Sequence, residues 1–282
     1  MPTVGFVGLG NIGAPMAGWL PKRFETYVYD LRAEATAPLV DLGCKVAESC
    51  ADLATRCDVI GVCVVDDAST KAVIAGDDGL LSAAKPGSVI AIHGTIRPQT
   101  AIDLAERGRE RAVDVIDAQI TGGAAGAKAG TLTSIVGGNA EAVERARPYM
   151  ECFSSQITLC GEVGAGAVAK ICNNVVVYQV YMALTEAIDL AAKNGIDQDK
   201  LVEVLSWMPD RSLTMLGPRR MLRAEPDHPA LRPGLEAAYG LSQKDLGLAL
   251  ELAASDVDGG LEVPGTEICR KQMRRIYGLP EE

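Results

Sequence analysis

Short apolar runs alternate with helical stretches over residues 3 to about 160, and this alternation constrains the fold more than any other feature of the chain. Most of the apolar runs are continuous and contain β-branched residues, as expected for strands buried on both faces of a parallel sheet. The connections are short and carry Gly, Pro or Asp. We therefore predict a doubly wound α/β domain with a mainly parallel sheet. Strands are expected at 3–8, 25–29, 59–65, 89–92, 113–117 and 132–137, and helices at 12–20, 33–42, 50–56, 68–75, 99–109 and 140–152.

The sequence changes character after Gly161. An apolar run extends from Ala167 to Ala192 and ends at Lys193-Asn194-Gly195, a helix-stop sequence. A helix that is apolar around most of its circumference has to be buried in a second domain or against another subunit. The remainder, to Ile276, has helical periodicity interrupted by prolines. We therefore expect an α/β domain over residues 1–161 and an all-helical domain over residues 162–282, joined by the long helix.

Composition excludes several classes of function. The chain has 27 basic and 37 acidic side chains, a formal net charge of −10, which argues against a nucleic-acid binder. No apolar run reaches the roughly 18 to 20 residues needed to cross a bilayer, and the first residues lack the features of a signal peptide. Cysteines in the first domain are six or seven residues apart rather than in CxxC pairs. We expect a cytoplasmic protein with reduced thiols, no metal, and neither nucleic acid nor membrane as partner.

The first expected strand ends in a GxGxxG sequence that a helix follows directly, Gly8-Leu9-Gly10-Asn11-Ile12-Gly13. Such a sequence is weak evidence alone, but this setting places its backbone N–H groups where they bind pyrophosphate oxygens. Asp30 ends the second strand, where a carboxylate accepts hydrogen bonds from ribose hydroxyls and repels a 2′-phosphate. A helix cap is the alternative role for Asp30. We expect a Rossmann domain that binds NAD in preference to NADP, a preference that the nearby Arg32 weakens.

A second glycine-dense stretch runs from Asp117 to Thr133. Its glycines follow a strand expected to end at Asp117, so the loop should lie at the carboxyl edge of the sheet, where open α/β folds bind their ligands. Exposed backbone amides and the Thr121 hydroxyl form a concave donor surface that suits a carboxylate. A flexible surface loop is the alternative interpretation.

Lys170 and Asn174 lie four residues apart near the start of the long helix and therefore share one of its faces. A lysine among Ala, Val and Ile either extends its amine to water or is a desolvated acid/base whose pKa is lowered by burial. Oxidation of an alcohol needs a group that removes the hydroxyl proton. The chain has only two histidines, His93 and His228, and their scarcity favours Lys170 for that role.

Together these motifs resemble the β-hydroxyacid dehydrogenase family, which includes 3-hydroxyisobutyrate dehydrogenase and the tartronate and succinic semialdehyde reductases. The similarity covers most of the chain. It rests on four ordered segments, which are residues 5–17, Thr121-Gly122-Gly123 with Gly130-Thr131-Leu132, residues 164–174, and Gln243-Lys244-Asp245-Leu246. The resemblance implies a Rossmann domain, a long interdomain helix, an all-helical second domain, and a homodimer or homotetramer built through those helices.

The resemblance also implies an activity, the transfer of a hydride between a nicotinamide cofactor and a small β-hydroxy acid or the corresponding semialdehyde or keto acid. Lys170 would be the general acid/base. Asn174, Lys244 and the Thr121-Gly122-Gly123 amides would bind the anionic substrate. Lys244 would close over the nicotinamide as well. Cofactor contacts would come from the glycine loop and Asp30, with Val65 at a strand end and Thr95 at the nicotinamide ribose.

Several residues depart from the family pattern and leave the substrate open. The family usually has serine at positions 94 and 121, where this chain has Gly94 and Thr121. It usually has a small polar or acidic residue near position 92 and Pro-Val at 119–120, where this chain has Ile92 and Gln119-Ile120. Trp19 stands where the family often has asparagine. His93 is either a polar contact in the cleft or a structural residue. A basic cluster in the helical domain either faces solvent or pairs with an anionic group of the substrate; it comprises Arg211, Arg219, Arg220 and Arg223.

Three other functions are weighed against this one. An imine reductase has a similar layout, but commonly carries aspartate or tyrosine where this chain has Lys170, and it prefers NADPH. A decarboxylating 6-phosphogluconate dehydrogenase needs a much longer helical region. A non-catalytic dinucleotide-binding module of the same ancestry tends to lose the lysine and gain basic tails, and this chain has done neither.

Overall fold

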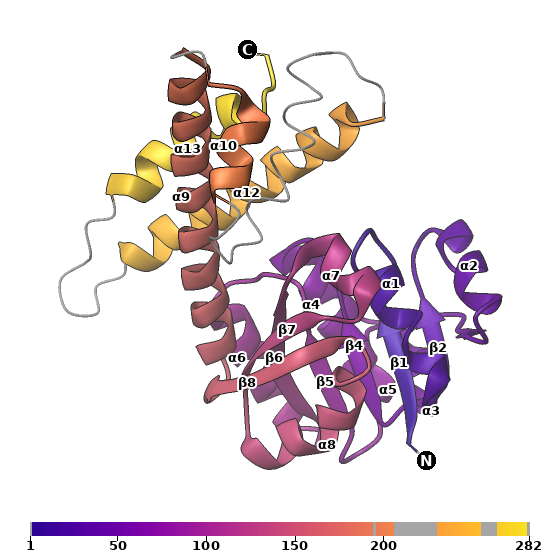
Figure 1. Cartoon of the computed structure of the whole chain (residues 1–282). Helices are drawn as coiled ribbons and strands as arrows, with labels where there is room; N and C mark the ends of the chain where they lie inside the picture. The colour runs from indigo at the N-terminus through magenta and orange to yellow at the C-terminus, as the bar shows by residue number, and fades with distance from the viewer. Residues whose placement is uncertain (1, 194–195, 206–229, 255–263, 281–282) are drawn as a thin grey trace. The chain divides into compact units, whose positions relative to one another are not determined.

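The structure is a computed structural model that describes residues 2–193, 196–205, 230–254 and 264–280 (Figure 1). Its contacts divide the chain into two compact units, residues 1–170 and 171–282. The long helix α9 (Ala165–Lys193) begins in the first unit and continues in the second. The division by contacts therefore lies inside a helix, nine residues beyond the change of sequence character at Gly161.

The first unit contains one eight-stranded sheet in the order β3-β2-β1-β4-β5-β6-β7-β8. All neighbouring strands are parallel except β6 and β7, which are antiparallel. The order reverses beside β1, as in a doubly wound Rossmann sheet, so the predicted fold class is confirmed. The strands are β1 (Thr3–Val7), β2 (Glu25–Tyr29), β3 (Lys45–Val46), β4 (Val59–Val62), β5 (Val89–Ile92), β6 (Asp114–Thr121), β7 (Leu132–Gly137) and β8 (Ser154–Gly161).

Alternate residues of the central strands enter two separate apolar clusters, one on each face of the sheet. In β5, Val89 and Ala91 belong to one cluster, and Ile90 and Ile92 belong to the other. The first cluster includes side chains of α1 (Gly13–Ala17), α7 (Gly123–Ala129) and α8 (Ala140–Met150). The second includes side chains of α3 (Cys50–Arg56), α4 (Asp67–Ala75), α5 (Leu80–Ala83) and α6 (Pro98–Arg109). Burial on both faces explains the continuous apolar runs in the sequence.

Two segments differ from the sequence-based expectation in a way that affects the site. The strand expected to end at Asp117 continues to Thr121, because β6 pairs with the antiparallel β7 from Asp117 onward. The following stretch was expected to be a loop, but it forms α7 and ends at Gly130 in the left-handed conformation (φ 68°), where glycine is favoured. In addition, β4 ends at Val62, so Val65 lies beyond the strand.

His93 lies in the core of the first unit, which favours the structural role over a polar contact in the cleft. Its Nδ1 is 2.7 Å from the Ala118 carbonyl oxygen, and its Nε2 is 3.1 Å from the Tyr149 hydroxyl. The ring stacks with Phe6 and Tyr149 and meets Phe153 edge on. Burial lowers the pKa of His93 to about 4, so the imidazole is neutral at physiological pH.

The second unit is formed by helices and short connecting segments in its described part. It contains most of α9, with α10 (Gln198–Leu205), α12 (Arg232–Ala253) and α13 (Pro264–Ile276). Residues of α12 and α13 form its main apolar cluster, against which Tyr178 and Tyr181 of α9 pack. None of the described helices is long and apolar enough to cross a membrane. The basic cluster at Arg211, Arg219, Arg220 and Arg223, like His228, lies outside the described residues.

Candidate functional site

The turn between β1 and α1 has the geometry of a dinucleotide-binding loop. Gly8 has φ 92°, and a Cβ at this position would overlap the Cys63 carbonyl oxygen. Gly13 opens α1 so close to the Gly8 carbonyl that a side chain there would also overlap it. Gly10, by contrast, has open space on its Cβ side. The first-turn N–H groups of a helix have no acceptor within it, so this loop fits a pyrophosphate.

Asp30 follows β2 and contacts the same loop. Its Oδ2 accepts a hydrogen bond from the Leu9 N–H at 2.6 Å, and its Oδ1 accepts from the backbone N–H and Nε of Arg32 at 2.9 and 3.2 Å. Burial acts to raise the pKa of Asp30, but the bonds from Leu9 and Arg32 outweigh it and leave the pKa below its ordinary value. The structure therefore places an ionised carboxylate beside the glycine loop, at the ribose position of this fold.

Asp30→Ser should shift cofactor preference from NAD toward NADP. The carboxylate repels a 2′-phosphate, and its removal also frees the Arg32 guanidinium for that phosphate. We expect the ratio of kcat/KM for NAD to that for NADP to fall by at least about tenfold. Glu25→Gln is the matched control, since Glu25 begins the same strand and pairs with Lys45. An unchanged ratio in Asp30→Ser would contradict the ribose role of Asp30.

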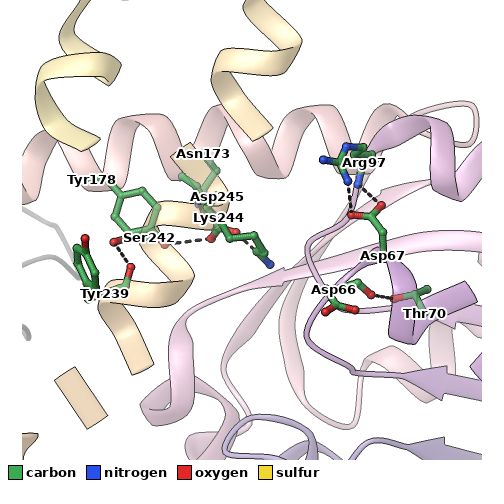
Figure 2. Close-up of polar contacts among 11 residues, drawn as sticks. Asp66, Asp67, Thr70, Arg97, Asn173, Tyr178, Tyr239, Ser242, Lys244 and Asp245 are labelled. Atoms are coloured by element: carbon green, nitrogen blue, oxygen red, sulfur yellow. Dashed lines mark hydrogen bonds and ion pairs between the residues drawn. The ribbon is translucent and has the colours of Figure 1, made fainter. Parts of the chain in front are cut away.

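The loops after β4 and β5 are linked at the carboxyl edge of the sheet, where they carry Val65 and Thr95. Asp67 accepts hydrogen bonds from the backbone N–H and Nη1 of Arg97 at 3.0 and 3.1 Å (Figure 2). Val65 is 66% exposed and Thr95 is half-buried. A Cβ at Gly94 would overlap the Val64 carbonyl oxygen, which gives a steric reason for glycine in place of the family serine.

Thr121, Gly122 and Gly123 join the end of β6 to α7. Gly122 has φ 126° and Gly123 has φ 61°, values that favour glycine over a residue with a side chain. Thr121 and Gly122 are half-buried, and Gly123 is exposed. These residues therefore lie at the carboxyl end of β6, where the sequence placed them, but they lead into a helix and do not form a loop. Their role as a donor surface stays a prediction.

Asp117 fixes the start of α9, the helix that carries Lys170. Its side chain is fully buried, and its two oxygens accept hydrogen bonds from the backbone N–H groups of Gly164 at 2.8 Å and Ala167 at 2.7 Å. A Cβ at Gly166 would lie 2.8 Å from Asp117 Oδ2, so the close approach requires glycine. Lys170 follows Ala167 by three residues and is half-buried. The carboxylate in the middle of β6 thus positions the turn that leads to the proposed acid/base.

Asn174 and Lys244 belong to the second unit, where both contact Asp245. Asn174 Nδ2 donates to Asp245 Oδ2 at 2.7 Å, and the Tyr178 hydroxyl donates to the same oxygen at 3.0 Å. Lys244 Nζ forms an ion pair with Asp245 Oδ1 at 3.2 Å (Figure 2). Burial, together with the Asp245 charge, raises the pKa of Tyr178 well above its ordinary value, so the phenol stays protonated and donates.

Sequence reasoning did not assign a role to Asp117 or to Asp245, and the structure gives both a central one. Asp245 is 7% exposed and orients two of the predicted substrate-binding residues. The feature of the sequence that could have identified them is a charged residue at a position that must be buried, since carboxylates are almost never fully buried without a partner. Among the described residues there is no cluster of side chains that could hold a metal ion.

Comparisons with known proteins agree with this geometry. Residues 3–161 match the family model described as the NAD binding domain of 6-phosphogluconate dehydrogenase. Residues 164–278 match the one described as the NAD-binding domain of NADP-dependent 3-hydroxyisobutyrate dehydrogenase. The chain belongs to the 3-hydroxyisobutyrate dehydrogenase-like family of the 6-phosphogluconate dehydrogenase NAD-binding superfamily, in both of its domains. It is therefore an NAD(P)-dependent oxidoreductase of the β-hydroxyacid dehydrogenase family.

Three similar proteins illustrate the range of this family. An uncharacterized oxidoreductase of Mycobacterium tuberculosis is 40% identical, over 99% of this chain and 94% of the relative. The NAD-dependent L-serine dehydrogenase of Pseudomonas aeruginosa is 36% identical, over 90% of this chain and 86% of the relative. The crystal structure of 3-hydroxyisobutyrate dehydrogenase from Salmonella typhimurium has a TM-score of 0.82 at 26% identity, over 98% of this chain and 94% of that one.

Proposed function

We propose that this protein oxidises a small β-hydroxy acid with NAD, using Lys170 as the general acid/base. The observation that carries the proposal is the anchoring of α9 by Asp117, which holds Lys170 one turn beyond a fixed point on the sheet. L-serine and 3-hydroxyisobutyrate, the substrates in the names of two similar proteins, both have a hydroxymethyl group on the carbon that bears the carboxylate. We assign this hydroxymethyl carboxylate unit to the substrate of the present enzyme.

Each part of the site has a distinct task in the proposed reaction. Bound NAD supplies the hydride acceptor at C4 of its nicotinamide. In the neutral form, Lys170 accepts the proton of the substrate hydroxyl, and in the reverse direction its ammonium returns that proton. The Thr121 hydroxyl and the Gly122 and Gly123 amides hold the carboxylate, because oriented N–H groups stabilise an anion without a full positive charge. Asn174 and Lys244 add a donor amide and a cation.

The choice of NAD over NADP rests on Asp30, whose carboxylate is ionised and directed to the glycine loop. A net charge of −10 does not oppose an anionic substrate, since local cations and amides decide the potential in a cleft. We retain three further predictions from the sequence: the domain boundary near Gly161, assembly into a homodimer or homotetramer through the helical domain, and a cytoplasmic location.

A substrate panel tests the proposal. Purified protein is assayed for NAD reduction with L-serine, 3-hydroxyisobutyrate and hydroxy acids that vary in chain length, α-substituent and distal charge, and for NADPH oxidation with cyclic imines. We expect saturable NAD reduction with at least one β-hydroxy acid and no turnover of the imines. Imine reduction without hydroxy-acid oxidation would assign the protein to the imine reductases. Dinucleotide binding without turnover of either hydroxy acids or imines would indicate a non-catalytic binding module.

A further inference from the structure

Trp19 connects the two glycine loops of the first unit. It follows the end of α1 by two residues, and its backbone N–H donates to the Met16 carbonyl at 3.2 Å. The helix that begins in the dinucleotide loop therefore determines where the indole lies. The indole Nε1 donates to the Ala127 carbonyl oxygen at 2.9 Å, in the last turn of α7. Because α7 starts at Gly123, this one side chain joins the cofactor loop to the helix that follows the substrate loop.

The indole ring adds packing to the hydrogen bond. A Cβ at Gly130, which ends α7, would lie only 3.1 Å from Trp19 Cε2, so the ring packs directly on the helix terminus. Lys22 Nζ lies 3.8 Å from the centroid of the ring. Ala17 and Ala127 are fully buried in the apolar cluster against which Trp19 packs. The contact between α1 and α7 therefore combines a hydrogen bond with apolar packing.

The position of α7 depends on contacts of this kind. A helix of 7 residues is too short to be stable by its own hydrogen bonds. Its first residues, Gly123 to Ala125, are exposed, whereas Gly126 and Ala127 are buried. The helix is only about 10 Å long, so a movement of the end that Trp19 contacts also moves the Gly123 end.

We propose that Trp19 is a positioning residue that couples the dinucleotide loop, Gly8–Gly13, to the turn Thr121-Gly122-Gly123 at the start of α7. When a dinucleotide orders α1, the indole orders α7 in turn, and the substrate amides are then held for binding. The consequence for substrate affinity rests on the proposed function. The coupling itself does not rest on the proposed function, because it concerns only cofactor binding and the hydrogen exchange of the α7 amides.

Hydrogen exchange with and without NAD tests the coupling directly. We compare wild type, Trp19→Phe, which keeps an aromatic ring but loses the indole N–H, and Tyr149→Phe. The last is a matched control, because it removes one side-chain hydrogen bond from the same apolar cluster but on α8. In wild type and Tyr149→Phe, saturating NAD should slow exchange of the 123–129 amides by about three- to tenfold. In Trp19→Phe this protection should disappear, although NAD still binds. Equal protection in Trp19→Phe, or none in wild type, would overturn the proposal.

Kinetics separate positioning from general stability. Trp19→Phe should raise KM for the hydroxy acid by about five- to tenfold and leave kcat and KM for NAD within about twofold. A loss of Tm with unchanged KM would mean that Trp19 is only structural, and would contradict the proposal. Absence of turnover in all three proteins, with NAD-dependent protection of α7 in wild type that Trp19→Phe abolishes, would contradict the proposed function and support the coupling.

Discussion

Lys170→Ala should lower kcat for hydroxy-acid oxidation by about 10³-fold and leave the Kd of NADH within about twofold. The variant lacks the amine that accepts the hydroxyl proton, and the chain offers few replacements: His93 is buried in the core, with both ring nitrogens in hydrogen-bonding contact. The residues proposed to contact the dinucleotide, Gly8–Gly13 and Asp30, lie after β1 and β2 and not on α9. Steady-state kinetics and a fluorescence titration with NADH measure the two quantities separately.

Lys85→Ala is the matched control for this experiment. Lys85 is a lysine of the same unit whose Nζ pairs with Asp58 at 3.4 Å, immediately before β4 and therefore at the amino edge of the sheet. It should retain wild-type kcat. Lys170→Ala with more than a tenth of wild-type turnover would remove Lys170 from the proton-transfer step.

Asp117→Ala should reduce the free energy of unfolding of the protein by about 3 kcal/mol at neutral pH. The substitution leaves the N–H groups of Gly164 and Ala167 without their carboxylate acceptor at the buried start of α9. Asp114→Ala, in the same strand, removes a surface ion pair with Arg145 and should cost less than about 1 kcal/mol. Urea unfolding, followed by a signal from the first unit, measures the free energy of unfolding of the three proteins. Equal effects of the two substitutions would contradict the capping role of Asp117.

The destabilisation by Asp117→Ala should also depend on pH. Burial raises the pKa of Asp117 to about 6, although backbone hydrogen bonds from Gly164 and Ala167 act against the shift. A carboxyl whose pKa is raised on folding stabilises the protein most below its unfolded pKa, and this contribution is lost as the pH rises through 6. The difference between wild type and variant should therefore be larger at pH 5 than at pH 7.5, by about 1 kcal/mol. A difference that grows with pH would contradict the raised pKa.

The sequence predicted the parts of the fold that depend on local pattern. Strands at 25–29, 89–92 and 132–137 and the helix at 50–56 have the expected bounds, because continuous β-branched runs and amphipathic periodicity are local signals. The strand, turn and helix around Gly8–Gly13 and the position of Asp30 after β2 also follow the sequence, since these elements succeed one another along the chain. The binding roles of these residues stay predictions. The family assignment was confirmed by the matches over both domains.

What the sequence did not predict depends on contacts between distant segments. The extension of β6 to Thr121 requires pairing with β7. The role of Asp117 requires Gly164, which is 47 residues later in the chain and immediately precedes α9, to lie beside it. The Asp245 contacts with Asn174 and Tyr178 likewise join residues that are 71 and 67 positions apart. Neither polarity nor periodicity identifies such partners, because both are properties of a local window.

The most direct test of the central claim is the fate of the substrate hydrogen. A β-hydroxy acid that the panel identifies as a substrate is deuterated at the carbon that bears the hydroxyl, and the NADH formed is analysed by mass spectrometry and NMR. We expect one deuterium at C4 of the nicotinamide in NADH produced by wild type, and loss of nearly all of this product with Lys170→Ala. Unlabelled NADH, or labelled NADH formed at the wild-type rate by Lys170→Ala, would contradict this expectation.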